Sequence, residues 1–268
     1  MGDAFQLSRD AAIKYDDHNV PAMFAPLARA TLGRIDLIDG MRVIDIACGT
    51  GALTREIAGR LGGTGHLVGT DLNATMIDVA LERHPADGHA AEYVAADVSD
   101  LPFGDGTFDL AFLQQGLQFF PDKPAALREV ARVLRPGGQL VLTCWRSLPP
   151  FHAVLSDRLA RHLGMAVAEK ARAPFSFRDG DVIARLLQEA PFEIIRHEEL
   201  VLERRFDDLR AQIMALPVEQ ELLAAGEDIV AAVVREVAEC LSGYARDAAF
   251  IVPQQAHLFC AHKTAGGR

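Results

Sequence analysis

The chain carries the stretch Val43-Ile44-Asp45-Ile46-Ala47-Cys48-Gly49-Thr50-Gly51, an apolar run with one carboxylate that ends in two glycines. Such a run is typical of a buried parallel strand that leads into a ligand-binding loop. The two glycines let the backbone turn sharply and approach a ligand closely, because neither carries a Cβ. In α/β sheets, ligands bind in the crevice at the carboxyl ends of the strands. The stretch therefore predicts an α/β fold with a binding site after its first strand.

Strands and helices alternate along the first half of the chain. The pattern predicts strands near 42–47, 66–70, 91–95, 108–113 and 139–145, with helices near 52–61, 74–83 and 123–134 between them and another helix over 22–35. This alternation indicates βαβ units and a parallel sheet covered by helices on both faces.

The rhythm changes beyond residue 145. The pattern there predicts helices near 151–164 and 180–190, a strand near 192–202, helical segments over 206–243 and a last strand near 256–262. We expect one domain over residues 1–268, with the late helices as a cap over the sheet edge. The expected core covers about 36–146, 180–202 and 252–263, and the expected cap or lid covers about 1–35, 147–179 and 204–250.

Composition limits the partners. The 268 residues include 37 acidic and 27 basic ones, for a net charge of −10, which gives no basic footprint for nucleic acid. No apolar run approaches the roughly 20 residues that cross a bilayer, and the N-terminus shows no signal-peptide pattern. We therefore expect no nucleic-acid partner, no membrane span and a cytoplasmic location.

The four cysteines are scattered. Cys48, Cys144, Cys240 and Cys260 show no CxxC spacing, which would be typical of a zinc site. We expect each of them to be a small buried residue, with no metal site and no disulfide framework.

Asp45 bears on which ligand the glycine loop binds. A dinucleotide site would follow the GxGxxG pattern, but Thr54 stands where the third glycine belongs. A buried carboxylate is costly unless it is hydrogen-bonded or paired with a charge, and pyrophosphate is a poor neighbour for it. Asp45 therefore favours a ligand that bears positive charge and weakens a nicotinamide-dependent dehydrogenase as the interpretation.

Two more acids end the next two strands. Asp71 follows the second strand, where it can accept both hydroxyls of a ribose. Asp97 follows the third strand, where it can accept a hydrogen bond from an adenine amine, with Val98 and Met76 offering apolar surface to the base. Three acids at successive strand ends, in register with the glycine loop, predict a nucleoside pocket on one rim of the sheet.

Five motifs follow one another in order. They are Ile44-Asp45-Ile46-Ala47-Cys48-Gly49-Thr50-Gly51, Gly69-Thr70-Asp71, Ala96-Asp97-Val98, Leu101-Pro102-Phe103-Gly104-Asp105-Gly106-Thr107-Phe108-Asp109 and Arg132-Val133-Leu134-Arg135-Pro136-Gly137-Gly138. Together they resemble the class I S-adenosylmethionine-dependent methyltransferases, in the small-molecule branch akin to the ubiquinone and menaquinone methyltransferases. The resemblance covers about residues 40–146. It implies a Rossmann-like, seven-stranded, mostly parallel sheet with an antiparallel last strand and a helical cap.

The resemblance also implies where S-adenosylmethionine binds. Asp45 and the loop 47–51 would hold its methionine part, Asp71 its ribose, and Asp97 its adenine. Residues 114–120 would border the sulfonium, between cofactor and acceptor. The implied cofactor contacts are Tyr15, Asp45, Ala47, Cys48, Gly49, Thr50, Gly51, Asp71, Leu72, Met76, Asp97, Val98, Gln114 and Gln115.

Methyl transfer from a sulfonium depends mainly on holding donor and acceptor in line. A base is needed only where the attacking atom must lose a tightly held proton. Tyr15, His18 and His152 are the candidate bases, and Gln118 with Gln114 is the candidate for positioning the acceptor. Tyr15 is also a candidate lid residue, since in related enzymes a tyrosine of the N-terminal segment closes over the cofactor.

The acceptor is the least specified partner. Residues 115–120 do not closely reproduce the signature of the quinone-biosynthesis enzymes, so quinone methylation is not assumed. The Asp/Asn-Pro-Pro-aromatic tetrad of the DNA adenine methyltransferases is absent as well, which favours a small molecule. The expected pocket walls are Phe119, Phe120, Trp145, Phe151, Phe175, Phe177, Leu216 and Leu222. These side chains favour a hydrophobic or aromatic metabolite, such as one of secondary metabolism.

We therefore expect an enzyme that transfers a methyl group to an oxygen, nitrogen or carbon atom of a small, apolar acceptor. A second interpretation is a methyltransferase-like protein that binds the cofactor without catalysis and acts as a regulator or partner. The dehydrogenase is the third. The identity of the acceptor, the methylated atom and the oligomeric state, including a homodimer, stay open.

Overall fold

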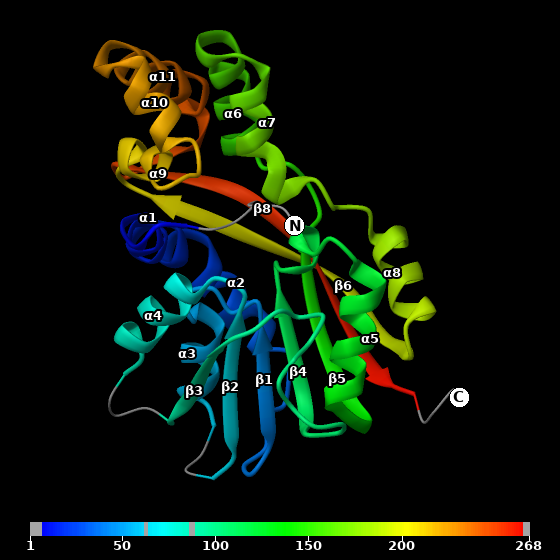
Figure 1. Ribbon diagram of the computed structural model, residues 1–268. Helices are drawn as coiled ribbons and strands as arrows, with labels where there is room; N and C mark the ends of the chain where they lie inside the picture. The colour runs from blue at the N-terminus through cyan, green and yellow to red at the C-terminus, as the bar shows by residue number, and fades with distance from the viewer. Residues whose placement is uncertain (1–6, 62–63, 86–88, 265–268) are drawn as a thin grey trace.

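The computed structural model describes residues 7–61, 64–85 and 89–264 and shows one twisted sheet with helices on both faces (Figure 1). The first half contains α1 (Arg9–Lys14), the π-helix η1 (Tyr15–Phe24), α2 (Ala25–Leu32), β1 (Arg42–Ile46), α3 (Ala52–Ala58), β2 (His66–Asp71), α4 (Ala74–Arg83), β3 (Ala91–Ala95), β4 (Phe108–Gln114), η2 (Leu117–Phe119), α5 (Lys123–Val133) and β5 (Leu134–Trp145). The second half contains α6 (Pro150–Leu163), α7 (Met165–Arg172), η3 (Ala173–Phe175), α8 (Gly180–Glu189), β6 (Phe192–Phe206), α9 (Leu209–Met214), α10 (Glu219–Ala225), α11 (Glu227–Cys240), η4 (Ser242–Tyr244), β7 (Ala245–Arg246) and β8 (Ala249–Lys263).

The sheet has the strand order β3-β2-β1-β4-β5-β8-β6, and the short β7 pairs with β8 outside this path. Strands β1 to β5 pair in parallel, whereas β8 is antiparallel to both β5 and β6. The prediction of a mostly parallel Rossmann-like sheet whose last strand is antiparallel is thus confirmed. The two-residue β7 is an eighth strand that the sequence pattern did not indicate, because so short a strand has no periodicity.

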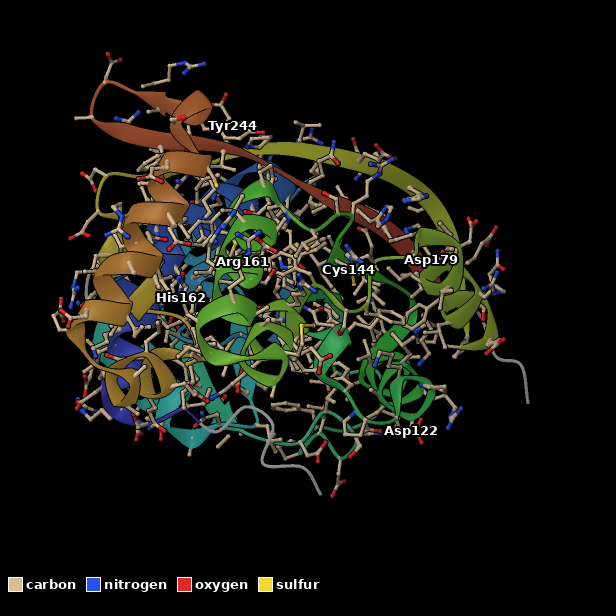
Figure 2. The ribbon with its side chains drawn as sticks, turned by 90° about the horizontal axis from the view of Figure 1, so that it is seen from above. Asp122, Cys144, Arg161, His162, Asp179 and Tyr244 are labelled. Carbon is tan, nitrogen blue, oxygen red and sulfur yellow. The ribbon has the colours of Figure 1, made fainter. Side chains whose placement is uncertain are left out.

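Each face of the sheet has its own hydrophobic core. Successive side chains of β1 point to opposite faces, as the pleat requires, and so belong to different cores. Val43 belongs to the core that includes residues of α2 and α3, while Ile44 belongs to the core that includes residues of α5 and α8. Aspartate caps fix where the helices on the second face begin. Asp122 accepts a hydrogen bond from Ala125 N at 2.8 Å and starts α5, and Asp179 starts α8 in the same way (Figure 2). The parallel strands are therefore held in register from both sides.

Strands β6 and β8 are 15 residues long, which is longer than the predicted 192–202 and 256–262. Strand β5 ends with Trp145 opposite Ala256, so residues 250–255 of β8 and 201–206 of β6 pair with each other beyond the end of β5. We call this extension the overhang. Its charged residues do not look like a buried strand in the sequence, and only pairing with the antiparallel neighbour extends it.

Helices α6, α7, α9, α10 and α11 gather at the overhang (Figure 1) and share a core of their own with it. Phe151 and Leu155 of α6 pack there with Phe206 of β6 and Val252 of β8. On the outer side, His162 Nε2 of α6 lies 3.0 Å from Glu236 Oε1 of α11, and this contact joins α6 to α11 (Figure 2). None of the helices described is both long and apolar enough to cross a membrane.

Two sequence predictions need correction. The N-terminal segment is helical from Arg9 rather than from residue 22, because Ser8 Oγ accepts from Ala11 N at 3.3 Å and Ala12 packs against Met76. Three of the cysteines are buried as expected, but Cys240 is exposed at the end of α11. All four cysteines are free thiols.

Candidate functional site

Asp45 is a buried carboxylate between β1 and α3. Its side chain is 1% exposed, and Thr54 Oγ1 donates a hydrogen bond to its Oδ2 at 2.6 Å. Burial raises the pKa of Asp45 to about 7, although the hydrogen bonds from Thr54 lower it. Sequence reasoning treated Thr54 only as a missing glycine, and no local signal reveals that it holds this carboxylate.

The loop after β1 is tightly wound. Ala47, Gly49 and Gly51 have φ angles of +55°, +57° and +81°. A Cβ on Gly51 would lie 2.8 Å from the Tyr93 hydroxyl, so only glycine fits there without displacement of its neighbours. Cys48 is buried in the same loop, where its N donates to Thr70 O at 2.9 Å.

Asp71 connects this loop to the end of β2. Its Oδ2 accepts from Gly49 N and its Oδ1 from Asn73 N, both at 2.9 Å. Burial raises the pKa of Asp71 against these two hydrogen bonds. Among the described residues, neither Asp71 nor Asp45 has a basic side chain within 4.0 Å. A buried carboxylate and a half-buried one, beside a glycine loop and without a cation partner among the described residues, form a site that suits a positively charged ligand.

The N-terminal segment covers the loop. The ring and hydroxyl of Tyr15 lie 4.0 Å from the position of a Cβ on Gly49. Asp16, which sequence reasoning did not single out, accepts hydrogen bonds from Thr50 Oγ1 at 2.6 Å and from Arg55 Nη2 at 2.9 Å. Burial, with Asp71 as the next largest cause, raises the pKa of Tyr15 well above its ordinary value, so its hydroxyl stays protonated at neutral pH.

Three glutamine side chains lie at the end of β4 and just after it. Gln114 Nε2 donates to Phe24 O at 3.3 Å, and Gln115 Nε2 donates to Thr143 Oγ1 at 3.5 Å. The Oε1 atoms of Gln114, Gln115 and Gln118 are all buried without a hydrogen-bond partner among the described residues. Unsatisfied buried acceptors are costly, so three together at one strand end indicate a place where a ligand supplies the donors.

The residues predicted to border adenine differ in exposure. Asp97 is exposed, and its Oδ1 accepts from Ser99 N and Ser99 Oγ, each at 2.8 Å. Val98 is half-buried, and Leu72 is 63% exposed. Met76 is buried against α1, so it offers a base less surface than the sequence suggested.

The two candidate histidines, His18 and His152, contact residues outside the glycine loop. His18 is half-buried, and its backbone oxygen accepts from Gln212 Nε2 at 2.9 Å. His152 lies in the first turn of α6 and is 2% exposed, and its ring centroid lies 4.3 Å from that of Phe175. Burial lowers the pKa of His152 well below its ordinary value, so its ring is neutral at pH 7.

The predicted apolar walls fall into separate groups. Trp145 and Phe175 lie 5.8 Å apart between ring centroids, and Phe24 lies 6.2 Å from Trp145. Phe120 and Phe177 pack on the α5 face of the sheet. The remaining members are Phe151, Leu216 and Leu222, which pack in the cap core, and Phe119, which is 36% exposed.

Comparisons with known proteins agree on one family. The family model described as "Methyltransferase domain" matches residues 44–142. The ubiquinone/menaquinone biosynthesis C-methyltransferase of Laribacter hongkongensis is 37% identical over 145 residues, which are 53% of this chain and 59% of that protein. The chain thus spans about three fifths of that relative. The enzyme of the same name from Chromobacterium violaceum is 36% identical over 178 residues, which are 63% of this chain and 72% of that protein.

Solved structures show the same fold. Phosphoethanolamine N-methyltransferase 2 of Haemonchus contortus, solved with phosphomonomethylethanolamine and S-adenosylhomocysteine, superposes with a TM-score of 0.62 at 20% identity. The superposition covers 98% of this chain and 59% of that one.

Proposed function

The chain belongs to the class I S-adenosylmethionine-dependent methyltransferases, in the branch akin to the ubiquinone/menaquinone methyltransferases, and we propose on this premise that it methylates a small, apolar or aromatic metabolite. The observation that carries the proposal is the pair of carboxylates on either side of the glycine loop, of which Asp45 is buried and Asp71 half-buried. Neither has a cation partner among the described residues, and the cofactor of this family carries both an ammonium and a sulfonium group.

The residues at the strand ends fit S-adenosylmethionine. We assign the methionine part to Asp45 and the loop 47–51, where the positive φ angles allow close approach of the backbone. We assign the ribose to Asp71, whose two oxygens each accept only one backbone hydrogen bond and keep lone pairs for hydroxyl donors. Asp97 and Val98 lie at the end of the next strand, which supports their assignment to adenine.

When bound, S-adenosylmethionine supplies an activated methyl group that an acceptor's lone pair can take in one in-line displacement, leaving S-adenosylhomocysteine. The protein's part is to hold the acceptor in line and to exclude water, which in well-oriented cases lowers a barrier by on the order of 7–11 kcal/mol. Gln114 and Gln118 can orient the acceptor with their unpartnered amide oxygens. Tyr15 lies against Gly49 of the loop.

Tyr15 is not suited to deprotonate the acceptor at neutral pH. The raised pKa of Tyr15 keeps its hydroxyl protonated, and a protonated phenol cannot accept a proton. The lowered pKa of His152 keeps its imidazole neutral, and its Nδ1 has no partner among the described residues. His152 nevertheless contacts Phe151 and Phe175 rather than the glycine loop, so we assign no base to the methyl-transfer step.

The names of the relatives direct the choice of acceptor. Two of them act in ubiquinone and menaquinone biosynthesis by their names, so hydroquinones are the first acceptors to test here, although residues 115–120 depart from the quinone signature. Simple phenols, amines and indoles complete the panel.

Two measurements test the proposal. Calorimetry should show that S-adenosylhomocysteine binds and NADH does not; binding of NADH alone would overturn the proposal. Acceptor-dependent release of S-adenosylhomocysteine across the panel, with the reaction lacking acceptor as the control, then tests catalysis. Binding without release by any acceptor would favour the non-catalytic alternative.

A further inference from the structure

Arg204 is a buried cation in the overhang of β6. Its side chain is 1% exposed, and among the described residues no carboxylate lies within 4.0 Å of it. Burial lowers the pKa of Arg204 to about 9, which still leaves the guanidinium charged at neutral pH. A buried charge without a counter-charge costs several kcal/mol. A binding role for Arg204 would explain why the protein tolerates this cost.

The partners of Arg204 are neutral and incomplete. Nη2 donates to Gln212 Oε1 at 2.7 Å and to Asn19 Oδ1 at 3.2 Å. Nη1 donates only to the sulfur of Met23, at 3.5 Å, and Nε has no partner among the described residues. A thioether is a weak acceptor. Two of the three nitrogens therefore lack an oxygen acceptor.

Other unpartnered polar atoms lie around the same point. Gln254 pairs opposite Leu202, which places it diagonally across from Arg204 on one face of the overhang, and its Oε1 is buried without a partner. Its Nε2 contacts the same Met23 sulfur, at 2.9 Å. His152, whose Nδ1 is also unpartnered, is close enough for the charge of Arg204 to lower its pKa. A cluster of unsatisfied polar atoms in one buried place is the signature of a ligand subsite.

A row of aromatic rings leads from the glycine loop to this cluster. Phe24 lies between Tyr15, at 5.2 Å, and Trp145, at 6.2 Å. Beyond Trp145 the row continues through Phe175 and His152 to Phe151, whose ring lies 4.7 Å below the Arg204 guanidinium carbon. Arg204 thus stands at the far end of a row of rings that begins beside the glycine loop and is buried from Trp145 onward.

We propose that Arg204 binds a carboxylate group of the methyl acceptor, which is therefore an aromatic acid rather than a neutral ring. The carboxylate replaces the thioether of Met23 as the acceptor of the guanidinium, since planar N–H donors match a planar pair of oxygens. Movement of Met23 away from Arg204 and Gln254 makes room for it. The inference rests on the proposed function, because it assumes that the aromatic row borders the acceptor.

The test uses a matched pair of probes, benzoate and benzamide, which differ in charge but hardly in shape. The protein is saturated with S-adenosylhomocysteine, and binding is followed by the fluorescence of Trp145, the only tryptophan in the chain. Because hydrogen bonds to charged groups are stronger than neutral ones, we expect benzoate to bind the wild type about tenfold or more tightly than benzamide. Equal binding of the two, or no binding of benzoate, would overturn the inference.

Substitutions test whether Arg204 causes the preference for benzoate over benzamide. Arg204→Met should abolish the preference for benzoate, whereas Arg205→Met, a change at the exposed neighbouring arginine, should leave it intact. Arg204→Gln replaces the methionine variant if that one does not fold, and the same loss is expected. A preference that survives in either Arg204 variant would overturn the inference. Calorimetry with S-adenosylhomocysteine alone separates the two proposals: its failure in the wild type contradicts the proposed function, whereas benzoate results bear only on Arg204.

Discussion

Asp45→Asn should make the protein without cofactor more stable at pH 8 and at the same time weaken cofactor binding. In the folded protein burial raises the pKa of Asp45 from 3.8 to about 7. The folded state therefore favours the protonated carboxyl, and the contribution of this group to stability is greatest below pH 4 and falls as the pH rises to 7. At about 1.4 kcal/mol for each pKa unit, the full loss is about 4 kcal/mol. The neutral amide avoids it.

Urea unfolding of the cofactor-free protein, followed by the fluorescence of buried Trp145, measures this difference. The Asp45→Asn substitution should raise the free energy of unfolding by several kcal/mol at pH 8, by less than half of that at pH 5, and by almost nothing at pH 4. Asp100→Asn, a change at an exposed acid on the same rim, is the control and should have no such pH dependence. A destabilisation by Asp45→Asn that is equal at pH 5 and pH 8 would refute the reasoning, as would unchanged binding of S-adenosylhomocysteine.

Two further predictions concern the loop and the ribose site. Asp71→Ala removes the acceptor of the Gly49 and Asn73 N–H groups and should weaken S-adenosylhomocysteine binding at least about tenfold by calorimetry; an unchanged dissociation constant would mean that the ribose lies elsewhere. Gly51→Ala forces a Cβ against Tyr93 at a φ of +81° and should lower the free energy of unfolding by about 1–3 kcal/mol. Gly243→Ala, where a Cβ meets nothing within 4 Å, should cost much less; equal losses would contradict the strain argument.

The sequence predicts the sheet well because each parallel strand is a short apolar run that ends in a glycine or an acid. Val43 to Gly51 and the approach to Asp71 are local signals, and the structure places them side by side at one edge. The assignment of these residues to cofactor contacts stays a prediction, as does that of Tyr15, His18 and Gln118.

The features that the sequence does not reveal depend on contacts between residues that are far apart in the chain. In the sequence, Arg204 looks like an ordinary exposed residue of a charged stretch. It is buried because β6 pairs with β8 and because α6 packs against it. Asp16 and Thr54 act through hydrogen bonds to residues that no periodic pattern connects with them. The predicted lengths of β6 and β8 are too short for the same reason, because the strands extend further only by pairing with each other.

The N-terminal π-helix joins three places at once. Asp16 bonds to Thr50 in the glycine loop, Asn19 Nδ2 donates to Ala215 O in the cap at 2.9 Å, and Met23 lies against Arg204. If cofactor and acceptor bind as proposed, the same ten residues border both sites, and we expect them to move before either product leaves. We expect release rather than chemistry to set the pace of catalysis, so that product formed in the first turnover appears as a burst ahead of the later ones.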